Sequence, residues 1–338
     1  MEPKVSCVNH AALVNGYYAG QVHLREDSLQ APSSAFVRPT GSAQSLEKMS
    51  AAAARRQRKR ETAARRRAER LDELTMQGKF VPLSNGARSV LQGAFDRFGG
   101  ARFVLRDFLP SFGDDRSKTP DVVASVPEMS NATALDGGKV YCNEADHVRV
   151  AAVDNARVVL PAWCSFAQCD VRELHQLELA RHKLIVMDPP WQNKSVSRGK
   201  RYDMFDHTEL LKVDVPHIAD LDECILAVWV TNRPRYMAYL REQALPSWGF
   251  TFHACWYWLK LCKDGELVTP LDSTHRLPVE TLVVAYPTTR VFFDEDIISR
   301  TDKKAELFAR ELRPYWTSVG NEVLKFQSSK MFHRCGAE

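Results

Sequence analysis

Short apolar runs dominate the chain after Gly138, and spacers of helical length separate several of them. Runs of this kind favour an α/β domain with a mostly parallel sheet. The predicted strands cover residues 148–153, 183–187, 224–230, 255–261, 281–286 and 306–308. Helices are predicted over 206–211 and 234–243. Ligands of such sheets bind beyond the carboxyl ends of the strands, so the candidate site is expected there.

Before this domain the pattern is weaker and predicts three segments. Residues 1–50 are expected to form a flexible head, residues 51–78 a basic helix, and residues 79–138 a small adaptor region with a helix at 87–98. Residues 139–338 then make up the α/β domain. The longest strongly apolar stretch, 225–230, is far short of the roughly 20 residues that a membrane-spanning helix needs. No membrane crossing is predicted.

Charge is concentrated in one block. The whole chain carries +4, but residues 51–70 hold nine basic and two acidic side chains, which gives +7 there and leaves −3 for the rest. Alanine and arginine dominate the block, and glycine and proline are absent from it, so a helix is favoured. It lacks an apolar stripe, which leaves two interpretations open: a solvated helix, or a nuclear import signal or phosphate-binding arm. Its candidate nucleic-acid contacts are Arg55, Arg56, Arg58, Lys59 and Arg60.

The eight cysteines do not indicate a metal site. No two of them have the C-x-x-C spacing of structural zinc sites, so no metal is predicted and buried thiols are expected. Residues 1–10 lack the apolar run of a secretory signal, which favours a reducing intracellular compartment.

The most specific motif follows the predicted strand 183–187. Asp188, Pro189, Pro190 and Trp191 come directly after it, and two prolines must end the strand in a stiff loop. An aromatic amine that attacks a methyl sulfonium needs a hydrogen-bond acceptor, a rigid carbonyl and an aromatic face. Asp188, the Pro189 carbonyl and Trp191 offer these three groups, and no strong base is required. The alternative is an ordinary strand-terminating turn.

Residues 184–191 resemble the catalytic segment of the adenine N6-methyltransferases of the MT-A seventy family. Residues 193–196 with Arg201 and Tyr202 are similar to the branch of that family called methyltransferase-like protein four. Further similar segments lie at 169–172, 228–231, 270–273 with His275, 306–310 and 316–327. The resemblance therefore covers nearly the whole C-terminal half.

This resemblance implies a Rossmann-like methyltransferase domain with permuted strand order, in which the catalytic strand precedes the cofactor strand. The implied cofactor is S-adenosylmethionine. By similarity, Asp170 and the Val171 backbone would face its adenine, and Asp188 would also face the cofactor. Arg310, Asn321 and Glu322 would contact its ribose or methionine portion, which suits a diol and a carboxylate.

The loop at 192–202 interleaves basic residues with an aromatic one, which suits a splayed or single-stranded nucleotide. Its candidate substrate contacts are Asn193, Lys194, Arg201 and Tyr202; a solvated loop is the alternative. The implied substrate is adenosine in RNA, with 2′-O-methyladenosine of a small nuclear RNA suggested by the branch. DNA adenine is a competing substrate, and a catalytically silent nucleic-acid-binding scaffold is an alternative of another class. The expected location is the nucleus, with the cytoplasm as a second location.

One segment departs from the family pattern. Between the strand 281–286 and residue 306, family members carry another strand, a Ser-x-Lys-Pro-like turn and a helix. Residues 287–305 are too few for that unit and contain no Lys-Pro step. Either Lys303, Lys304 or Arg300 replaces the missing cofactor-binding lysine, or cofactor binding is impaired.

Overall fold

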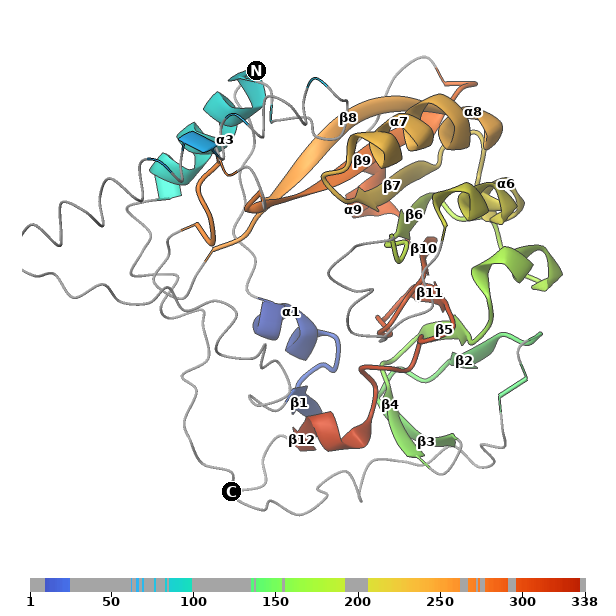
Figure 1. Cartoon of the computed structure of the whole chain (residues 1–338). Coiled ribbons are helices and arrows are strands. Elements are labelled where there is room, and N and C mark those ends of the chain that lie inside the picture. Colours follow the sequence, from blue (N-terminus) through green and yellow to red (C-terminus); the bar gives the residue numbers. More distant parts are fainter. Residues whose placement is uncertain are drawn as a thin grey trace, which may run out of the picture.

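The computed structural model (Figure 1) places much of the chain, including nearly all of the predicted α/β domain. It describes residues 10–24, 62, 65–66, 69, 76, 83, 85–98, 135–136, 138–153, 156–191, 206–261, 267–271, 273, 277–290 and 296–334.

An eight-stranded sheet forms the centre of the domain, with the strand order β2-β5-β11-β10-β6-β7-β9-β8. Five neighbouring strands, β5, β11, β10, β6 and β7, are parallel, while β2, β9 and β8 are antiparallel to their neighbours. The mostly parallel α/β fold predicted from the sequence is thus confirmed, and the domain is Rossmann-like. The strands are β2 (Tyr141–Asn143), β5 (Cys164–Ala167), β6 (Leu184–Met187), β7 (Ile225–Val230), β8 (Phe250–Leu259), β9 (Val279–Pro287), β10 (Lys304–Leu307) and β11 (Trp316–Val319).

The permuted order is visible in the sheet. Strand β6, which leads into Asp188, comes earlier in the chain than β10 and β11, yet these two insert between β6 and β5. The continuous apolar sequences of β6 and β7 follow from this arrangement, because strands inside a parallel sheet are covered on both faces.

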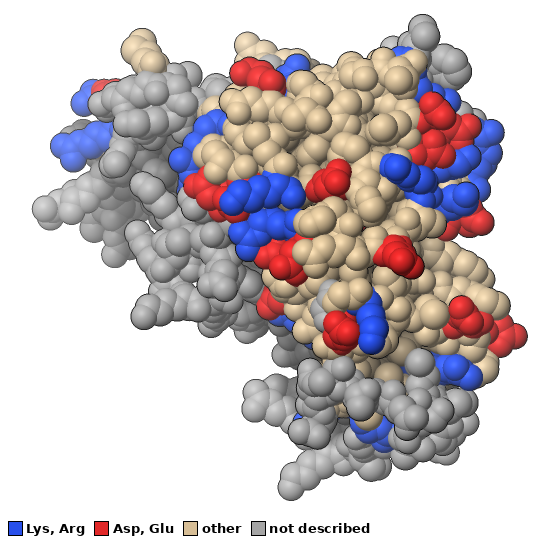
Figure 2. Space-filling model, turned by 90° about the vertical axis from the view of Figure 1, so that its right-hand side faces the viewer, with Lys and Arg blue, Asp and Glu red and all other residues tan. Residues whose placement is uncertain are grey.

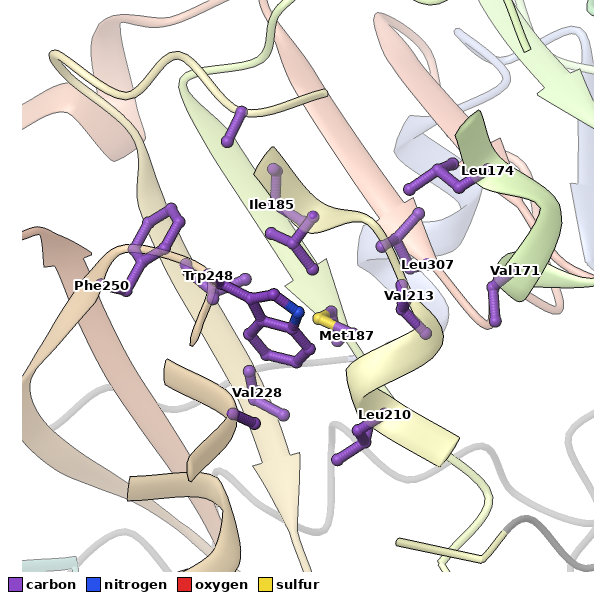
Figure 3. Close-up of a cluster of buried hydrophobic side chains, with 14 of the residues drawn as sticks. Val171, Leu174, Ile185, Met187, Leu210, Val213, Val228, Trp248, Phe250 and Leu307 are labelled. Atoms are coloured by element: carbon purple, nitrogen blue, oxygen red, sulfur yellow. The ribbon is translucent and has the colours of Figure 1, made fainter. Parts of the chain in front are cut away.

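The sheet has two faces that are covered unequally. We call the face that carries Ile185, Met187 and Leu307 the first face, and the face that carries Leu184 and Val186 the second face; side chains alternate between them along each strand. Helical elements pack on the first face and bury the main hydrophobic cluster, part of which is drawn in Figure 3. They are the 3₁₀-helices η5 (Val171–Gln176) and η6 (His207–Lys212), α6 (Val215–Ile218), and the continuous helix α7 (Pro234–Tyr239), π-helix η7 (Leu240–Ala244) and α8 (Leu245–Ser247).

The second face has a thinner cover. Leu184, Ile225 and Val284 form a small cluster there, against which Ile298 of α9 (Asp296–Arg300) and Trp316 pack. Further along the same face, Ala309 and Leu312 pack on Phe166 of β5.

Three peripheral groups surround the sheet. Helix α1 (His10–Gly16) leads into β1 (Val22–Leu24), which pairs with β12 (Phe332–Arg334); a 3₁₀-turn, η8 (Ser329–Met331), precedes β12. Strands β3 (Arg149–Val153) and β4 (Ala156–Leu160) form an antiparallel pair beside them. In Figure 1 these two groups, α1 with β1 and β12 and the β3–β4 pair, lie at the opposite end of the molecule from α7 and α8. Helix α3 (Asn85–Phe98) lies near the end of β8 and the start of β9, where Leu91 shares a hydrophobic cluster with Leu271 and Val279.

Several predicted elements need correction. The run 148–153 is a strand but belongs to the β3–β4 pair and not to the central sheet, because Val148 and Val150 pack on α1 and β1. The sequence analysis missed β5 and β11, whose short runs include polar residues. Residues 10–24, assigned to a flexible head, form α1 and β1.

The helix predicted at 206–211 is 3₁₀-helix η6, and the predicted helix 234–243 continues to Ser247. Most of the basic block lies outside the described residues; Thr62, Arg65, Arg66, Glu69 and Met76 are helical.

The described cysteines are free thiols. Cys164, Cys169 and Cys224 are buried as expected, whereas Cys142 is exposed and Cys255 half-buried. Within the described parts of the chain, no group of three or more His, Cys, Asp or Glu side chains is arranged to bind a metal ion. Among the same described residues, no helix has the length and apolar character needed to span a bilayer.

Ile185 on the first face tests how the sheet is held to its helices. It is fully buried in the main cluster, so Ile185→Ala should lower the free energy of unfolding by about 2–5 kcal/mol in urea titration, through lost burial and a cavity. Leu211→Ala, at an exposed position of η6, is the control and should cost far less. Equal losses in the two variants would contradict this packing.

Candidate functional site

The carboxyl ends of four parallel strands meet at one edge of the sheet. Met187 of β6 pairs with Leu307 of β10, Leu307 pairs with Val319 of β11, and Val319 pairs with Ala167 of β5. The residues that follow these strands therefore begin at the same level. This edge brings together all six predicted cofactor-binding residues: Asp170, Val171, Asp188, Arg310, Asn321 and Glu322.

Asp188 lies directly beyond β6 and is paired with a cation. Its backbone N–H donates to the Leu307 carbonyl at 3.3 Å, and its Oδ2 accepts from Nη2 of Arg310 at 3.1 Å. The carboxylate is 42% exposed, yet the protein around it raises its pKa by desolvation. Arg310 lowers this pKa and Glu280 raises it further. Asp188 is thus a partly exposed acceptor, with one oxygen held by a guanidinium.

The two prolines end β6 as predicted and turn the chain sharply. The Trp191 N–H donates to the Pro189 carbonyl at 2.8 Å, which leaves that oxygen a second lone pair for another donor. Trp191 is only 7% exposed; its ring stacks on Tyr236 at 4.9 Å, and its Nε1 donates to the Trp229 carbonyl at 2.7 Å. The indole therefore anchors the loop to α7 and β7, and one of its faces is already covered. Its stacking on a substrate base stays a prediction.

Asp170 has a structural partner at this edge of the sheet. It caps η5, since its carboxylate accepts from the backbone N–H of Arg172 at 2.9 Å and also from the Arg172 guanidinium. These hydrogen bonds lower its pKa. Arg172 also donates to Glu209 at 2.8 Å, which ties η5 to η6. The side chain of Val171 is buried in the main cluster, so only its backbone can meet a ligand.

Arg310, Asn321 and Glu322 come from the segments after β10 and β11. The Arg310 carbonyl accepts from the Phe326 N–H at 3.0 Å, and its guanidinium lies 6.0 Å from the Phe326 ring. Asn321 is exposed, and Glu322 pairs with Lys325 at 2.8 Å. All three are exposed, and they follow strands that end at the same sheet edge as β6.

Two backbone features at this edge were missed by the sequence analysis. Phe308, the first residue after β10, has φ 61°, a left-handed conformation that is strained for a bulky residue. A Cβ on Gly320, the first residue after β11, would lie 2.8 Å from the Ala309 carbonyl oxygen. The backbone segments that follow β10 and β11 are therefore in direct contact, and Gly320 permits this close approach because it has no Cβ. The glycine was the one signal in the sequence.

The residue types at the edge fit S-adenosylmethionine. An adenine ring can use an acceptor and backbone groups, as at Asp170 and Val171. A ribose diol can use an amide and a carboxylate, as at Asn321 and Glu322, and a methionine carboxylate can use a guanidinium, as at Arg310. Each of the three portions thus has a matching partner within one sheet edge.

The proposed substitutes for the missing lysine are not at this edge, which corrects one expectation. Lys304 begins β10 and pairs with Leu184, so it lies at the amino end of the strand, about 10 Å from Leu307 at ordinary strand rise. Lys303 and Arg300 precede it in the chain. The strand-turn-helix unit is absent among the described residues of 287–305, where the short α9 precedes β10. Arg310 is the cation that the structure places at Asp188.

The predicted substrate contacts Asn193, Lys194, Arg201 and Tyr202 lie outside the described residues, as do Arg55, Arg56, Arg58, Lys59 and Arg60. Their roles stay predictions.

Two exposed tryptophans of β8, Trp256 and Trp258, were missed; we call them the aromatic row. In the strand register, Met187 lies opposite Val228 on β7, which continues to Val283 on β9 and Cys255 on β8. Asp188 is the next residue, so it lies at the level of Trp229, Leu282 and Trp256 on these three strands. By alternation this row faces the second face, as Asp188 does. Trp256 and Trp258 are 40% and 46% exposed, and Trp258 pairs with Glu280, which influences Asp188. Three strand spacings separate β6 from β8, or about 15 Å.

A buried acid lies beside the site. Glu306 of β10 is 8% exposed, and burial raises its pKa to about 7; Arg313 opposes this shift, and Glu311 and Asp188 add to it. Arg313 approaches Oε2 of Glu306 at 3.4 Å, yet that oxygen has no hydrogen-bond partner among the described residues.

The comparisons with known proteins agree with this geometry. The family model described as MT-A70 matches residues 182–302. N(6)-adenine-specific methyltransferase METTL4 of Homo sapiens is 33% identical over 262 residues, which cover 66% of this chain and 55% of that protein. N6-methyladenosine RNA methyltransferase MTA1 of Pyricularia oryzae is 31% identical over 179 residues (43% and 47%). DNA N6-methyl methyltransferase of Caenorhabditis elegans is 30% identical over 211 residues (54% and 57%).

A mostly parallel sheet with this motif at the end of β6 has the architecture of a Rossmann-like methyltransferase fold. Residues 182–302 thus match an MT-A70 domain, and about two-thirds of the chain is similar in sequence to METTL4. The chain spans about half the length of the METTL4 proteins that it matches.

The buried Glu306 makes stability depend on pH. Its folded-state pKa of about 7 lies above its ordinary value of 4.5, so the folded state binds more protons, and stability should fall as pH rises through this window. Glu306→Gln removes the effect and should gain about 3 kcal/mol relative to the unchanged chain between about pH 5 and pH 8. Urea unfolding at the two pH values measures this. Exposed Glu178→Gln is the control; parallel curves for Glu306→Gln and the unchanged chain would contradict the shift.

Proposed function

We propose that this protein is an S-adenosylmethionine-dependent methyltransferase that acts on the N6 amino group of adenosine in RNA. The position of Asp188 is the observation that supports this most strongly. It follows the central strand β6, pairs with Arg310, and adjoins the strand ends that carry donors and acceptors suited to the cofactor. The names of the MT-A70 relatives support the same reaction class.

The bound cofactor would supply the electrophilic methyl group. Asp188 would accept one hydrogen of the adenine amino group, and the free lone pair of the Pro189 carbonyl would accept the other. These two acceptors orient the nitrogen lone pair toward the methyl carbon. The amine becomes acidic as the N–C bond forms, so its proton can pass to Asp188, whose raised pKa favours uptake. Arg310 holds the other carboxylate oxygen and stabilises the orientation.

The aromatic row beside the site supports an unpaired nucleic-acid substrate. Exposed tryptophan rings stack on bases of any sequence, and a base inside a duplex would first have to be flipped out. Trp256 and Trp258 are exposed on the face that carries Asp188, within reach of neighbouring nucleotides. On the side of the molecule seen in Figure 2, basic and acidic side chains lie side by side in small groups, so no large single-sign patch dominates that side.

The finer substrate is also part of the proposal. The resemblance of residues 193–196, Arg201 and Tyr202 to the methyltransferase-like protein four branch suggests 2′-O-methyladenosine in a small nuclear RNA as the substrate, and the basic block at 51–70 suggests a nuclear location. DNA adenine is the competing substrate, because one relative is named a DNA N6-methyl methyltransferase.

A second candidate function is a catalytically silent nucleic-acid-binding scaffold. The observation in its favour is that Lys303, Lys304 and Arg300 lie at the amino end of β10 and cannot replace the missing lysine at the cofactor edge. Binding of the cofactor separates the two candidates.

Replacing Asp188 tests the mechanism. Asp188→Asn keeps the shape but donates where an acceptor is needed, so methyl transfer to an unpaired adenosine should fall at least about a hundredfold. Mass spectrometry of nucleosides from RNA and DNA oligonucleotides, with and without the 2′-O-methyl group, measures turnover and substrate together. Lys139→Met, a substitution in an exposed ion pair, is the control. Calorimetry with S-adenosylmethionine accompanies it: no heat at millimolar ligand would leave only the scaffold.

The aromatic row can be tested separately from the chemistry. Trp256→Ala and Trp258→Ala should each weaken binding of a single-stranded oligonucleotide by about 1–3 kcal/mol, measured by fluorescence anisotropy, and should leave cofactor affinity unchanged. Tyr315→Ala removes an exposed ring at the amino end of β11 and serves as the control. Equal binding by all three variants would remove the row from the substrate surface.

A further inference from the structure

The connection between β10 and β11 is unusually short. The two strands are parallel neighbours, so residues 308–315 must return from the carboxyl end of one to the amino end of the other. Such crossovers normally take a dozen or more residues and include a helix. This crossover begins and ends in left-handed conformations, with φ 61° at Phe308 and 64° at Tyr315. It crosses the second face of the sheet, since Leu312 packs there on Phe166.

Polar groups are trapped beneath this crossover. Glu306 pairs with Ser318 in the β10–β11 register, and both are buried on the second face. Neither the Ser318 Oγ nor the Glu306 Oε2 has a hydrogen-bond partner among the described residues. A buried carboxylate oxygen without a hydrogen bond costs free energy, so it should attract any cation within reach.

Arg313 of the crossover is the cation nearest to Glu306 of those that the structure describes there. Its guanidinium hydrogen-bonds Glu311 at 2.7 Å and 3.0 Å, lies 5.3 Å from the Trp316 ring, and approaches Glu306 at 3.4 Å. The other charged groups that act on Glu306 are Glu311, Asp188 and Arg310, and Tyr17 also faces this cluster. Arg310 thus lies within the influence of two carboxylates, Asp188 and Glu306.

We propose that Arg313 is a positioning residue that neutralises Glu306 and thereby leaves Arg310 paired with Asp188. The proposal rests on the proposed function only in giving Asp188 its role in methyl transfer. Without Arg313, the buried Glu306 draws the Arg310 guanidinium toward itself, and Asp188 loses its partner. The crossover is short and tight, so a small displacement of Arg310 is enough to break a contact of 3.1 Å.

This proposal predicts a rescue that a purely structural role would not give. Arg313→Met should raise the pKa of Asp188, because the cation that lowers it has moved, and should reduce turnover about tenfold or more. Adding Glu306→Gln removes the competing charge, so the double variant should regain the Asp188 pKa and most of the turnover, in a strongly non-additive cycle. Arg313→Lys keeps the cation and should behave nearly as the unchanged chain.

Two measurements on the full chain make the test. Carbon-13 NMR of labelled aspartate carboxyl groups, with the Asp188 signal assigned from Asp188→Asn, follows the titration without requiring any activity. Methyl transfer to an RNA oligonucleotide with an unpaired adenosine gives kcat and KM for each variant. The first measurement stands even if the chain proves to be inactive, so failure of the proposed function and failure of this proposal are distinguishable.

An unchanged Asp188 titration in Arg313→Met would overturn the proposal, and so would an equal loss of turnover in the single and double variants. Arg313 would then only stabilise the fold. A rise in the single variant and a return in the double variant supports it. If Arg313→Met does not fold, Arg313→Gln with and without Glu306→Gln gives the same comparison. Lys139→Met should show the titration of the unchanged chain.

Discussion

The alignment of four parallel strand ends determines where the candidate site lies. Strands β5, β11, β10 and β6 stop at one level, and the backbone hydrogen bonds of the sheet fix their register. Residues distant in the sequence, such as Asp188 and Arg310, are adjacent only because of this register. The two prolines after Asp188 reinforce it, because they prevent β6 from extending past its neighbours. Any change that shifts β6 by one residue would move Asp188 to the first face and away from Arg310.

The sequence predicted the centre of this arrangement better than its surroundings. Residues 183–187 and 224–230 were recognisable because strands covered on both faces are apolar throughout, and the proline step marked the end of β6 without ambiguity. Strand β11 was missed because its sequence Trp-Thr-Ser-Val is half polar; Ser318 is nevertheless buried under a crossover that no local pattern reveals. The run at 148–153 was assigned to the wrong sheet, since periodicity identifies a strand but not its partner.

The site shows the same division. The motif gave Asp188, and family resemblance gave the residues around the cofactor edge, but neither gave their partners. The ion pair of Asp188 with Arg310, the cap that Asp170 provides, and the burial of Trp191 against Tyr236 all depend on tertiary contacts. The expectation for Lys303 and Lys304 was wrong for a geometric reason: being close in sequence to Glu306 put them at the start of a strand whose other end carries the site. The exposure of the Trp256 and Trp258 rings was not predicted, because apolar residues on an outer strand have the same sequence pattern as those of a buried one.

The pairing of β1 with β12 has a consequence for the order in which the protein assembles. His23 and its partner His333 are separated by almost the entire described chain, so this contact has a very high sequence separation. During synthesis α1 and β1 leave the ribosome early, whereas β12 follows only after the sheet's last strands. Val14, Tyr18 and Val22 can meet Val148, Val150 and Val159 of their cluster earlier, but the cluster is complete only when Phe332 emerges. Docking of the amino-terminal segment is expected to be a late event of folding, completed on a sheet that has already formed.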